Sequence, residues 1–225
     1  MDKDMAKPRG TLIAFEGLDR SGKSTQCQLL VNRLRDGGHA VEHMRFPNRS
    51  TPIGQMINNY LAGDAQTEDH VIHLLFSANR WESAAEIAKL IAEGTTVVMD
   101  RYYYSGIVYT AAKSMEGMGL DWCRQPEVGL PRPDVCVFLG VDAVVAEQRG
   151  GFGAERYENR EMQLRVRQLF DELRLNGKYH ESKDIEAFDA GKPVEDVHQD
   201  VWHAVERVVK RVIGEGTALR KVEAW

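Results

Sequence analysis

Short runs of apolar residues alternate with stretches of helical periodicity along the chain. The apolar runs predict strands at 11–15, 39–46, 95–100 and 134–141, and a weaker strand at 184–189. The helical spacing predicts helices at 24–36, 52–61, 67–93, 102–115, 157–176 and 193–213, and the start of another at 142–148. Alternating strands and helices predict an α/β protein, with a parallel five-stranded sheet and helices on both faces.

The turn residues agree with most of these boundaries. Gly37 and Gly38 end the first helix, Thr51 and Pro52 suit the start of the second, and Gly94 ends the third. The stretch 117–133 is rich in Gly and Pro and reads as turns, and the tail 214–225 has no assigned element. No linker, repeat or low-complexity block divides the chain, so we expect one domain over residues 1–225.

The composition narrows the classes of partner. The 29 Lys and Arg residues are outnumbered by 34 Asp and Glu residues, and the formal net charge is −5. An acidic surface repels phosphate backbones, so we expect no nucleic-acid partner, although local cations can still bind a small anion. The apolar run at 135–141 is too short to span a bilayer, so we expect no membrane partner.

The cysteines and the first residues bear on the compartment. The chain has three cysteines, and no two of them form a CxxC pair, which argues against a disulfide framework or a structural zinc site. Residues 1–9 lack the apolar core of a secretory signal. We expect a reducing, cytoplasmic location, with the nucleus and the mitochondrion left open.

One motif points directly to phosphate chemistry. Residues 17–24, GLDRSGKS, fit the pattern G-x-x-x-x-G-K-[ST], between a predicted buried strand and a predicted helix. In such a loop, backbone N–H groups and a helix N-terminus surround the phosphates. Lys23 would reach the β- and γ-phosphates, and the Ser24 hydroxyl would bind Mg²⁺. The alternative is a glycine turn that matches by chance.

The ends of the other parallel strands carry groups that suit the same chemistry. Ligands bind beyond the carboxyl ends of the strands in an open parallel sheet. Phe46 and Arg49 follow the second strand, and Arg101 and Ser105 follow the third. Asp100 closes an apolar strand, as expected of a carboxylate near Mg²⁺, although it could instead cap the helix predicted after it.

Two further features have both a functional and a structural interpretation. Phe76 and Arg80 lie on one helical face, where they could stack on a base and bind its edge. Phe76 could equally belong to the core, but Arg80 has no acidic neighbour three or four residues away. The segment 149–157 is rich in Gly and contains Arg149 and Arg156, which favours a mobile lid over phosphates (about 149–160) but also suits a surface loop.

Taken together, the motifs resemble the eukaryotic type of thymidylate kinase, a nucleoside monophosphate kinase of the P-loop NTPase fold with a lid segment. The resemblance covers roughly residues 10–200. It is carried by the segments 15–26, 45–49, 74–82, 100–102, 120–123, 129–134 and 155–159. It implies that ATP phosphorylates dTMP to dTDP, a step of dTTP synthesis, by in-line transfer with Mg²⁺. It also implies a homodimer.

The resemblance assigns roles residue by residue. The implied ATP-binding residues are Gly17, Asp19, Arg20, Ser21, Gly22, Lys23, Ser24, Thr25 and Arg149. The implied dTMP-binding residues are Asp19, Phe46, Arg49, Phe76, Arg80, Arg101, Ser105, Gly106, Tyr109, Tyr157 and Gln163. Arg20, Lys23 and Arg101 would be catalytic, and Ser24 and Asp100 would hold the metal. The resemblance also suggests a cis peptide bond before Pro47.

The reaction implied by the resemblance needs no general base, and two other functions remain as alternatives. The acceptor is a phosphate whose second pKa is about 6, so it is mostly deprotonated near neutral pH and needs no general base. A P-loop switch protein is one rival, although the chain has no NKxD-type box. A kinase of the same fold that acts on another nucleoside monophosphate is the second.

Overall fold

The fold is built around a parallel five-stranded sheet. The computed structural model describes residues 8–142, 156–157 and 159–225. The strands lie in the order β2-β3-β1-β4-β5, and every neighbouring pair is parallel. Their bounds are β1 (Leu12–Gly17), β2 (Val41–Arg45), β3 (Thr96–Asp100), β4 (Val135–Gly140) and β5 (Ile185–Asp189). The predicted sheet and its strands are therefore confirmed, and β1 lies at its centre.

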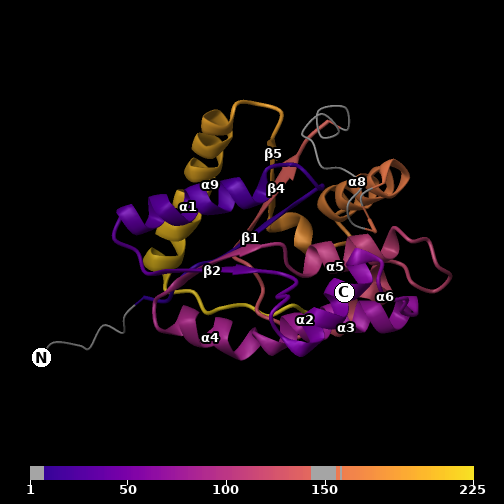
Figure 1. The fold of residues 1–225 in the computed structure, drawn as a ribbon. Coiled ribbons are helices and arrows are strands. Elements are labelled where there is room, and N and C mark those ends of the chain that lie inside the picture. The colour runs from indigo at the N-terminus through magenta and orange to yellow at the C-terminus, as the bar shows by residue number, and fades with distance from the viewer. Residues whose placement is uncertain (1–7, 143–155, 158) are drawn as a thin grey trace, which may run out of the picture.

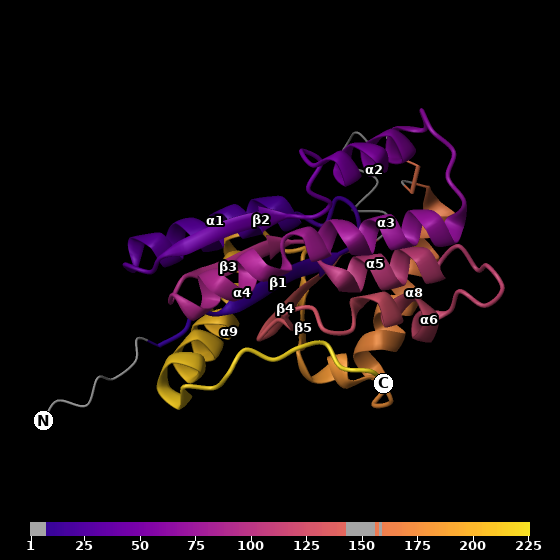
Figure 2. The same ribbon diagram turned by 90° about the horizontal axis from the view of Figure 1, so that it is seen from below.

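Helices cover both faces of the sheet (Figures 1 and 2). They are α1 (Lys23–Asp36), α2 (Pro52–Ala62), α3 (Asp69–Glu82), α4 (Ala84–Ala92), α5 (Tyr103–Ala111), α6 (Leu120–Arg124), α8 (Arg160–Leu175) and α9 (Val194–Glu215), with short 3₁₀ helices η1 (Gln125–Glu127) and η2 (His180–Lys183). Side chains alternate along β1: Ile13 and Phe15 pack under α1 and α9, whereas Leu12 and Ala14 face the side of α4, α5 and α8.

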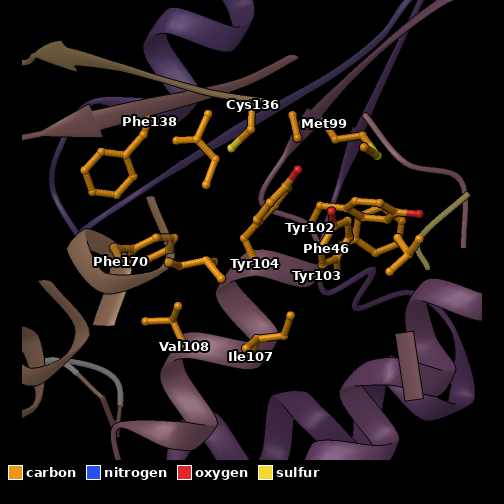
Figure 3. Packing of buried hydrophobic residues seen from close by; sticks show 14 of the residues in the cluster. Phe46, Met99, Tyr102, Tyr103, Tyr104, Ile107, Val108, Cys136, Phe138 and Phe170 are labelled. Carbon is orange, nitrogen blue, oxygen red and sulfur yellow. The ribbon is translucent and has the colours of Figure 1, made fainter. Parts of the chain in front are cut away.

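The larger core lies on the α4, α5 and α8 side of the sheet. Figure 3 shows aromatic rings from α5 beneath the strands, where Tyr103 and Tyr104 stack with ring centroids 4.1 Å apart. Both tyrosines are completely buried. Phe138 of β4 packs against Phe170 of α8 in the same cluster. This packing holds α5 below the end of β3. The position of α5 in turn fixes the short connection between them, Arg101 and Tyr102.

The structure corrects several predicted boundaries. The single helix predicted at 67–93 is two helices, α3 and α4, which meet at Ser83. The helix predicted at 102–115 ends at Ala111, and the one predicted from 157 begins at Arg160. Most of the helix start predicted at 142–148 lies outside the described residues. The turn-rich stretch 117–133 contains α6 and η1.

The tail after α9 is an extended segment. Lys221 forms an isolated antiparallel bridge with Pro131, and Val222 is buried in the larger core. Arg9, near the other end of the described chain, pairs with Asp134 at 2.8 Å. Among the helices of the described residues, none combines the length and apolar character that a bilayer crossing needs.

Candidate active site

The phosphate loop forms a tight cradle between β1 and α1. Gly17 and Gly22 have positive φ angles of 140° and 89°, and Arg20 has a φ of 64°. A Cβ atom on Gly17 would lie 2.3 Å from the carbonyl oxygen of Leu139, so only glycine fits there. Gly22 is the N-cap of α1, which therefore directs its first N–H groups into the loop.

Lys23 folds back into this cradle. Its Nζ donates to the carbonyl oxygens of Gly17 and Leu18 at 3.2 and 2.5 Å. Burial, together with the nearby Arg101 guanidinium, lowers the pKa of Lys23 to about 8. A bound polyphosphate would stabilise the charged ammonium, so the lysine is ready to bind an anion.

Ser24 and Asp100 meet at the mouth of the loop. The Ser24 hydroxyl donates to Oδ2 of Asp100 at 2.5 Å, and Arg45 approaches the same oxygen at 3.8 Å. The N-cap of α5 is Tyr102, and its N–H donates to the buried Glu16 carboxylate at 2.9 Å. The interpretation of Asp100 as a helix cap is therefore wrong.

The Ser24 and Asp100 oxygens suit Mg²⁺. A hydroxyl and a carboxylate beside a phosphate loop are hard oxygen ligands, and Mg²⁺ commonly takes one or two protein ligands together with phosphates and water. Within the described residues no group of three or more His, Cys, Asp and Glu side chains forms a potential metal cage. The donor set therefore fits an ion that is shared with a nucleotide rather than one enclosed by the protein.

Asp19 and Arg101 form the centre of the site. Arg101 donates to Oδ1 of Asp19 and, at 2.9 Å, to the Ser105 hydroxyl. Tyr109 and Gln163 donate to Oδ2 of Asp19 at 3.1 and 2.8 Å. These contacts tie the phosphate loop, the end of β3, α5 and α8 together at one point.

The electrostatics of this pair favour both charged forms. Burial alone would raise the pKa of Asp19, but Arg101 and Lys23 lower it below its usual value. Burial opposes the charge on Arg101, but Tyr109 and Asp19 raise its pKa. Its backbone φ of 67° directs Arg101 toward the loop, and its guanidinium lies 5.2 Å from the centre of the Tyr109 ring.

Arg80 lies at the other end of the site and is almost completely buried. Its Nε donates to Oε2 of Glu127 at 2.8 Å, and its Nη2 donates to Oε1. The expectation that Arg80 has no acidic neighbour one helical turn away is correct. Its acidic partner, Glu127, lies 47 residues further along the chain. Gly106 lies against this guanidinium, since a Cβ atom there would be 2.5 Å from Nη2 of Arg80.

These groups share one cavity of about 770 Å³ at the carboxyl ends of β1 and β3. Its lining includes most of the residues expected from the sequence. They are Asp19, Arg20, Ser21, Gly22, Lys23, Ser24, Thr25, Phe46, Arg49, Phe76, Arg80, Asp100, Arg101, Ser105, Gly106, Tyr109 and Tyr157. Gly17 and Gln163 contact the cavity's polar groups from behind, through Lys23 and Asp19.

Comparison with known proteins identifies the family. The family model for thymidylate kinase matches residues 15–201. The chain is 44% identical to the human thymidylate kinase over 215 residues, which cover 94% of this chain and 99% of that protein. It is 48% identical to the Schizosaccharomyces pombe thymidylate kinase over 200 residues, covering 89% of this chain and 93% of that protein. This chain belongs to the thymidylate kinase family.

A solved structure supports the same assignment. The Candida albicans thymidylate kinase superimposes with a TM-score of 0.81 and 37% identity, covering 95% of this chain and 98% of that chain. The chain therefore has the P-loop NTPase fold of thymidylate kinases, and the predicted resemblance is confirmed. Members of this family are enzymes that phosphorylate dTMP to dTDP with ATP as the phosphoryl donor.

Two parts of the cavity region were not singled out by the sequence analysis: residues beside β5 that line the cavity, and Glu127, which lies against Arg80. Ala190 and Lys192 of the loop after β5 line the cavity, together with Val194 and Val197 of the first turn of α9. The rule that ligands lie beyond the carboxyl ends of strands would have found this loop, had it been applied to the last strand. Glu127 had no comparable signal, because its partner Arg80 is distant in sequence.

The expected lid segment is only partly described by the structure. Arg149 and most of the lid expected at 149–160 fall outside the described residues. Arg156 contacts the end of α2, donating to the carbonyl oxygen of Tyr60 at 3.0 Å, and the Tyr157 hydroxyl lies 3.3 Å from that of Tyr60. Arg49 reaches the cavity wall from beyond the cis Phe46–Pro47 bond and donates to Asn58 at 2.9 Å.

Proposed function

We propose that this chain transfers the γ-phosphoryl group of ATP to dTMP, in line and with Mg²⁺, giving ADP and dTDP. One observation carries the proposal: a single cavity holds the phosphate-loop Lys23, the central Arg101 and the buried Arg80. Lys23 lies where a polyphosphate would bind, and Arg80 lies where a base would bind. Arg101 lies between them, where two phosphates would meet.

The loop end of the cavity suits the ATP phosphates. The loop N–H groups, Ser21 and Lys23 would bind the β- and γ-phosphates, and Thr25 would line the same cradle. Ser24 and Asp100 would hold Mg²⁺. When bound, this ion neutralises negative charge on the phosphate oxygens. The loop after β5 and Gln26 border the same end and offer a place for the nucleoside of ATP.

The centre suits the phosphate of dTMP. Arg101 and Arg49 would bind it, and Ser105 would hold the Arg101 guanidinium in place through their 2.9 Å hydrogen bond. Asp19 would keep Arg101 aligned and contact the region of the sugar 3′-hydroxyl. The acceptor oxygen carries no proton near neutral pH, so the protein must mainly cancel repulsion between two anions and align them.

The far end suits the sugar and the base of dTMP. Phe76 is half-buried on α3 and would stack on thymine, while Phe46, which packs 5.6 Å from Tyr102, would form the opposite wall. Arg80 would donate to the O4 edge of the base. Tyr109 and Tyr157 lie with ring centroids 5.8 Å apart and would enclose the sugar, with Gln163 behind them.

Arg20 is the proposed catalytic arginine of the loop. It lines the same cavity as Lys23 and Arg101 and would contact the transferring phosphoryl group. An arginine in that position supplies about 10³–10⁵-fold in rate in related phosphoryl transfers. Closure of a lid by residues 149–160, with Arg149 on the ATP phosphates, would exclude water and limit hydrolysis.

The domain organisation, the assembly and the location are predictions from the sequence. We expect one kinase domain over residues 1–225. We also expect a homodimer, and the exposed apolar side chains of α3 support it. They follow helical spacing and are Val71, Leu74 and Trp81. A cytoplasmic location, with the nucleus and the mitochondrion open, is what the sequence predicts.

An ADP-release assay across several acceptors tests the proposed function. With ATP and Mg²⁺, dTMP should be the preferred acceptor among dTMP, dUMP, dGMP, AMP and CMP. Preference for another monophosphate would support the related kinase instead. Nucleotide-dependent binding of a protein partner, without turnover of dTMP, would support a switch protein. Omission of Mg²⁺ should abolish ADP release.

A further inference from the structure

The segment 220–225, which we call the strap, lies beside the segment that carries Glu127. The Val222 N–H donates to the Leu130 carbonyl oxygen at 2.9 Å, and the Gly129 N–H donates to the Val222 carbonyl oxygen at 2.8 Å. Val222 is buried, with 1% of its surface exposed. Figure 2 shows the yellow chain leaving α9 and crossing toward the side of the molecule where α6 lies. The strap therefore holds the residues that directly follow η1.

The strap also holds the residue before η1. Arg124 is completely buried and donates to the Glu181 carboxylate at 2.8 Å and to the carbonyl oxygen of Glu223. The Trp225 ring lies 4.7 Å from the Arg124 guanidinium, and its Nε1 donates to Glu181 at 2.6 Å. Removing the strap would leave Arg124 without its ring contact and without one acceptor.

η1 lies between these two anchors and carries Glu127. On its other side, Ser77 and Trp81 of α3 both donate to the carbonyl oxygen of Pro126, at 3.1 and 2.8 Å. The Glu127 carboxylate is completely buried and contacts the Arg80 guanidinium through two hydrogen bonds. Two parallel bonds fix both the position and the plane of a guanidinium. The exact place of Glu127 therefore sets the direction of the remaining Arg80 N–H groups.

We propose that Glu127 is a positioning residue for base recognition, and that the strap sets its place, so that a segment outside the cavity controls selectivity for the monophosphate. This proposal rests on the proposed function, because it takes Arg80 as the group that binds the base edge. It concerns neither the phosphate loop nor the transferring group. Changes at Glu127 or in the strap should therefore alter the binding of the monophosphate and leave the binding of ATP unchanged.

A comparison of dTMP with dCMP tests this proposal directly. Thymine presents the O4 acceptor at its edge, where cytosine presents an amino donor. A correctly aimed guanidinium binds the first and opposes the second. When the aim is lost, the KM for dTMP rises and the preference for dTMP over dCMP falls. A loss of folded protein would instead lower activity toward both nucleotides in the same proportion.

The experiment compares three variants of the full enzyme with the wild type. Glu127→Gln removes the charge but keeps the size, a chain ending at Leu219 removes the strap, and Trp225→Ala weakens it. We expect Glu127→Gln to raise the KM for dTMP about tenfold, because Arg80 then loses the charged partner that fixes the plane of its guanidinium. The kcat and the KM for ATP should change less than about twofold, as expected when the binding of the monophosphate is weakened equally in the ground state and in the transition state.

The strap variants should show the same pattern with smaller amplitude. The chain ending at Leu219 should lower the ratio of kcat/KM for dTMP to that for dCMP about fivefold, and Trp225→Ala should lower it less. If dCMP turnover is too slow, its inhibition constant against dTMP replaces kcat/KM. Arg207→Ala, which removes a surface ion pair of α9 with Glu186, is the matched control and should leave every parameter unchanged.

Each contrary result has one meaning. If Arg80→Gln lowers the selectivity ratio but folded Glu127→Gln does not, Glu127 does not position Arg80. If Glu127→Gln lowers it but both strap variants keep the wild-type ratio, the strap has no part in recognition. A wild-type enzyme that does not phosphorylate dTMP overturns the proposed function itself. The melting temperature of each variant verifies that folded protein is compared.

Discussion

The two ends of the nucleotide cavity are built in different ways. The phosphate end is made of residues close together in sequence, since the loop 17–24 folds on itself and meets one strand end through the Ser24–Asp100 bond. The proposed base end depends on Arg80, whose guanidinium is bound by Glu127 from a distant segment. The difference teaches that phosphate binding can be predicted from a short motif, whereas the proposed selectivity depends on contacts between segments that are distant in sequence.

The largest expected effect tests the phosphate end. Arg20→Ala should lower kcat about 10³-fold, because the arginine no longer stabilises the negative charge on the transferring phosphoryl group. The KM for dTMP and the preference for dTMP over dCMP should stay nearly constant, since the base end is untouched. Steady-state kinetics with both acceptors measure this. An unchanged kcat would remove Arg20 from the mechanism.

The second prediction concerns the point where the two ends meet. Arg101→Lys should lower kcat/KM for dTMP about 10²-fold, because a lysine cannot bind Asp19, Ser105 and a phosphate in one plane. The KM for ATP should change little. Arg207→Lys on the surface of α9 is the matched control. If the KM for ATP rose by the same factor as the KM for dTMP, the division of the cavity into two ends would be wrong.

The third prediction uses the pKa of Lys23, which burial and Arg101 lower to about 8. Below pH 8 the ammonium is charged and ready for phosphate. Above pH 8 the free protein loses this proton, and ATP must restore it on binding. The dissociation constant for ATP should therefore rise about tenfold between pH 7 and pH 9, since one pH unit above the pKa is one factor of ten.

The control for this prediction keeps the charge at high pH. Lys23→Arg carries a guanidinium that stays protonated over the whole range. Its ATP affinity, whatever its absolute value, should vary little with pH. Calorimetry in buffers of different ionisation enthalpy would detect proton uptake by the wild type at pH 9. Absence of that uptake would contradict the assignment to Lys23.

The smallest expected effect tests the base end. Gly106→Ala places a Cβ atom 2.5 Å from Nη2 of Arg80. Because Glu127 holds this guanidinium and burial leaves it little room, Arg80 must turn away from its aligned position. The KM for dTMP should rise about fivefold, a loss of about 1 kcal/mol, with kcat and the KM for ATP nearly unchanged. An unchanged KM would mean that Arg80 moves freely.

The sequence predicted the elements whose signals are local. Lys23, Ser24 and Asp100 follow from a motif and a strand end, and the sheet follows from its apolar runs. The break between α3 and α4 was missed, because Ser83 lies in a stretch without Gly or Pro and so carries no local signal for a helix end. The strap was missed because its bonds at Val222 join backbone groups, which carry no residue-specific signal, and because its side-chain partners Arg124 and Glu181 are distant in sequence.

The register of the central strands has a consequence for how this enzyme can vary. Phe15 pairs with Asp100 across β1 and β3, so the ladder of backbone bonds sets the position of the Asp100 carboxylate beside the loop. Inserting one residue within β3 would turn that carboxylate to the opposite face of the sheet. A single added residue between Thr96 and Asp100 should therefore abolish activity, whereas an added residue in an exposed loop far from the cavity leaves this register unchanged.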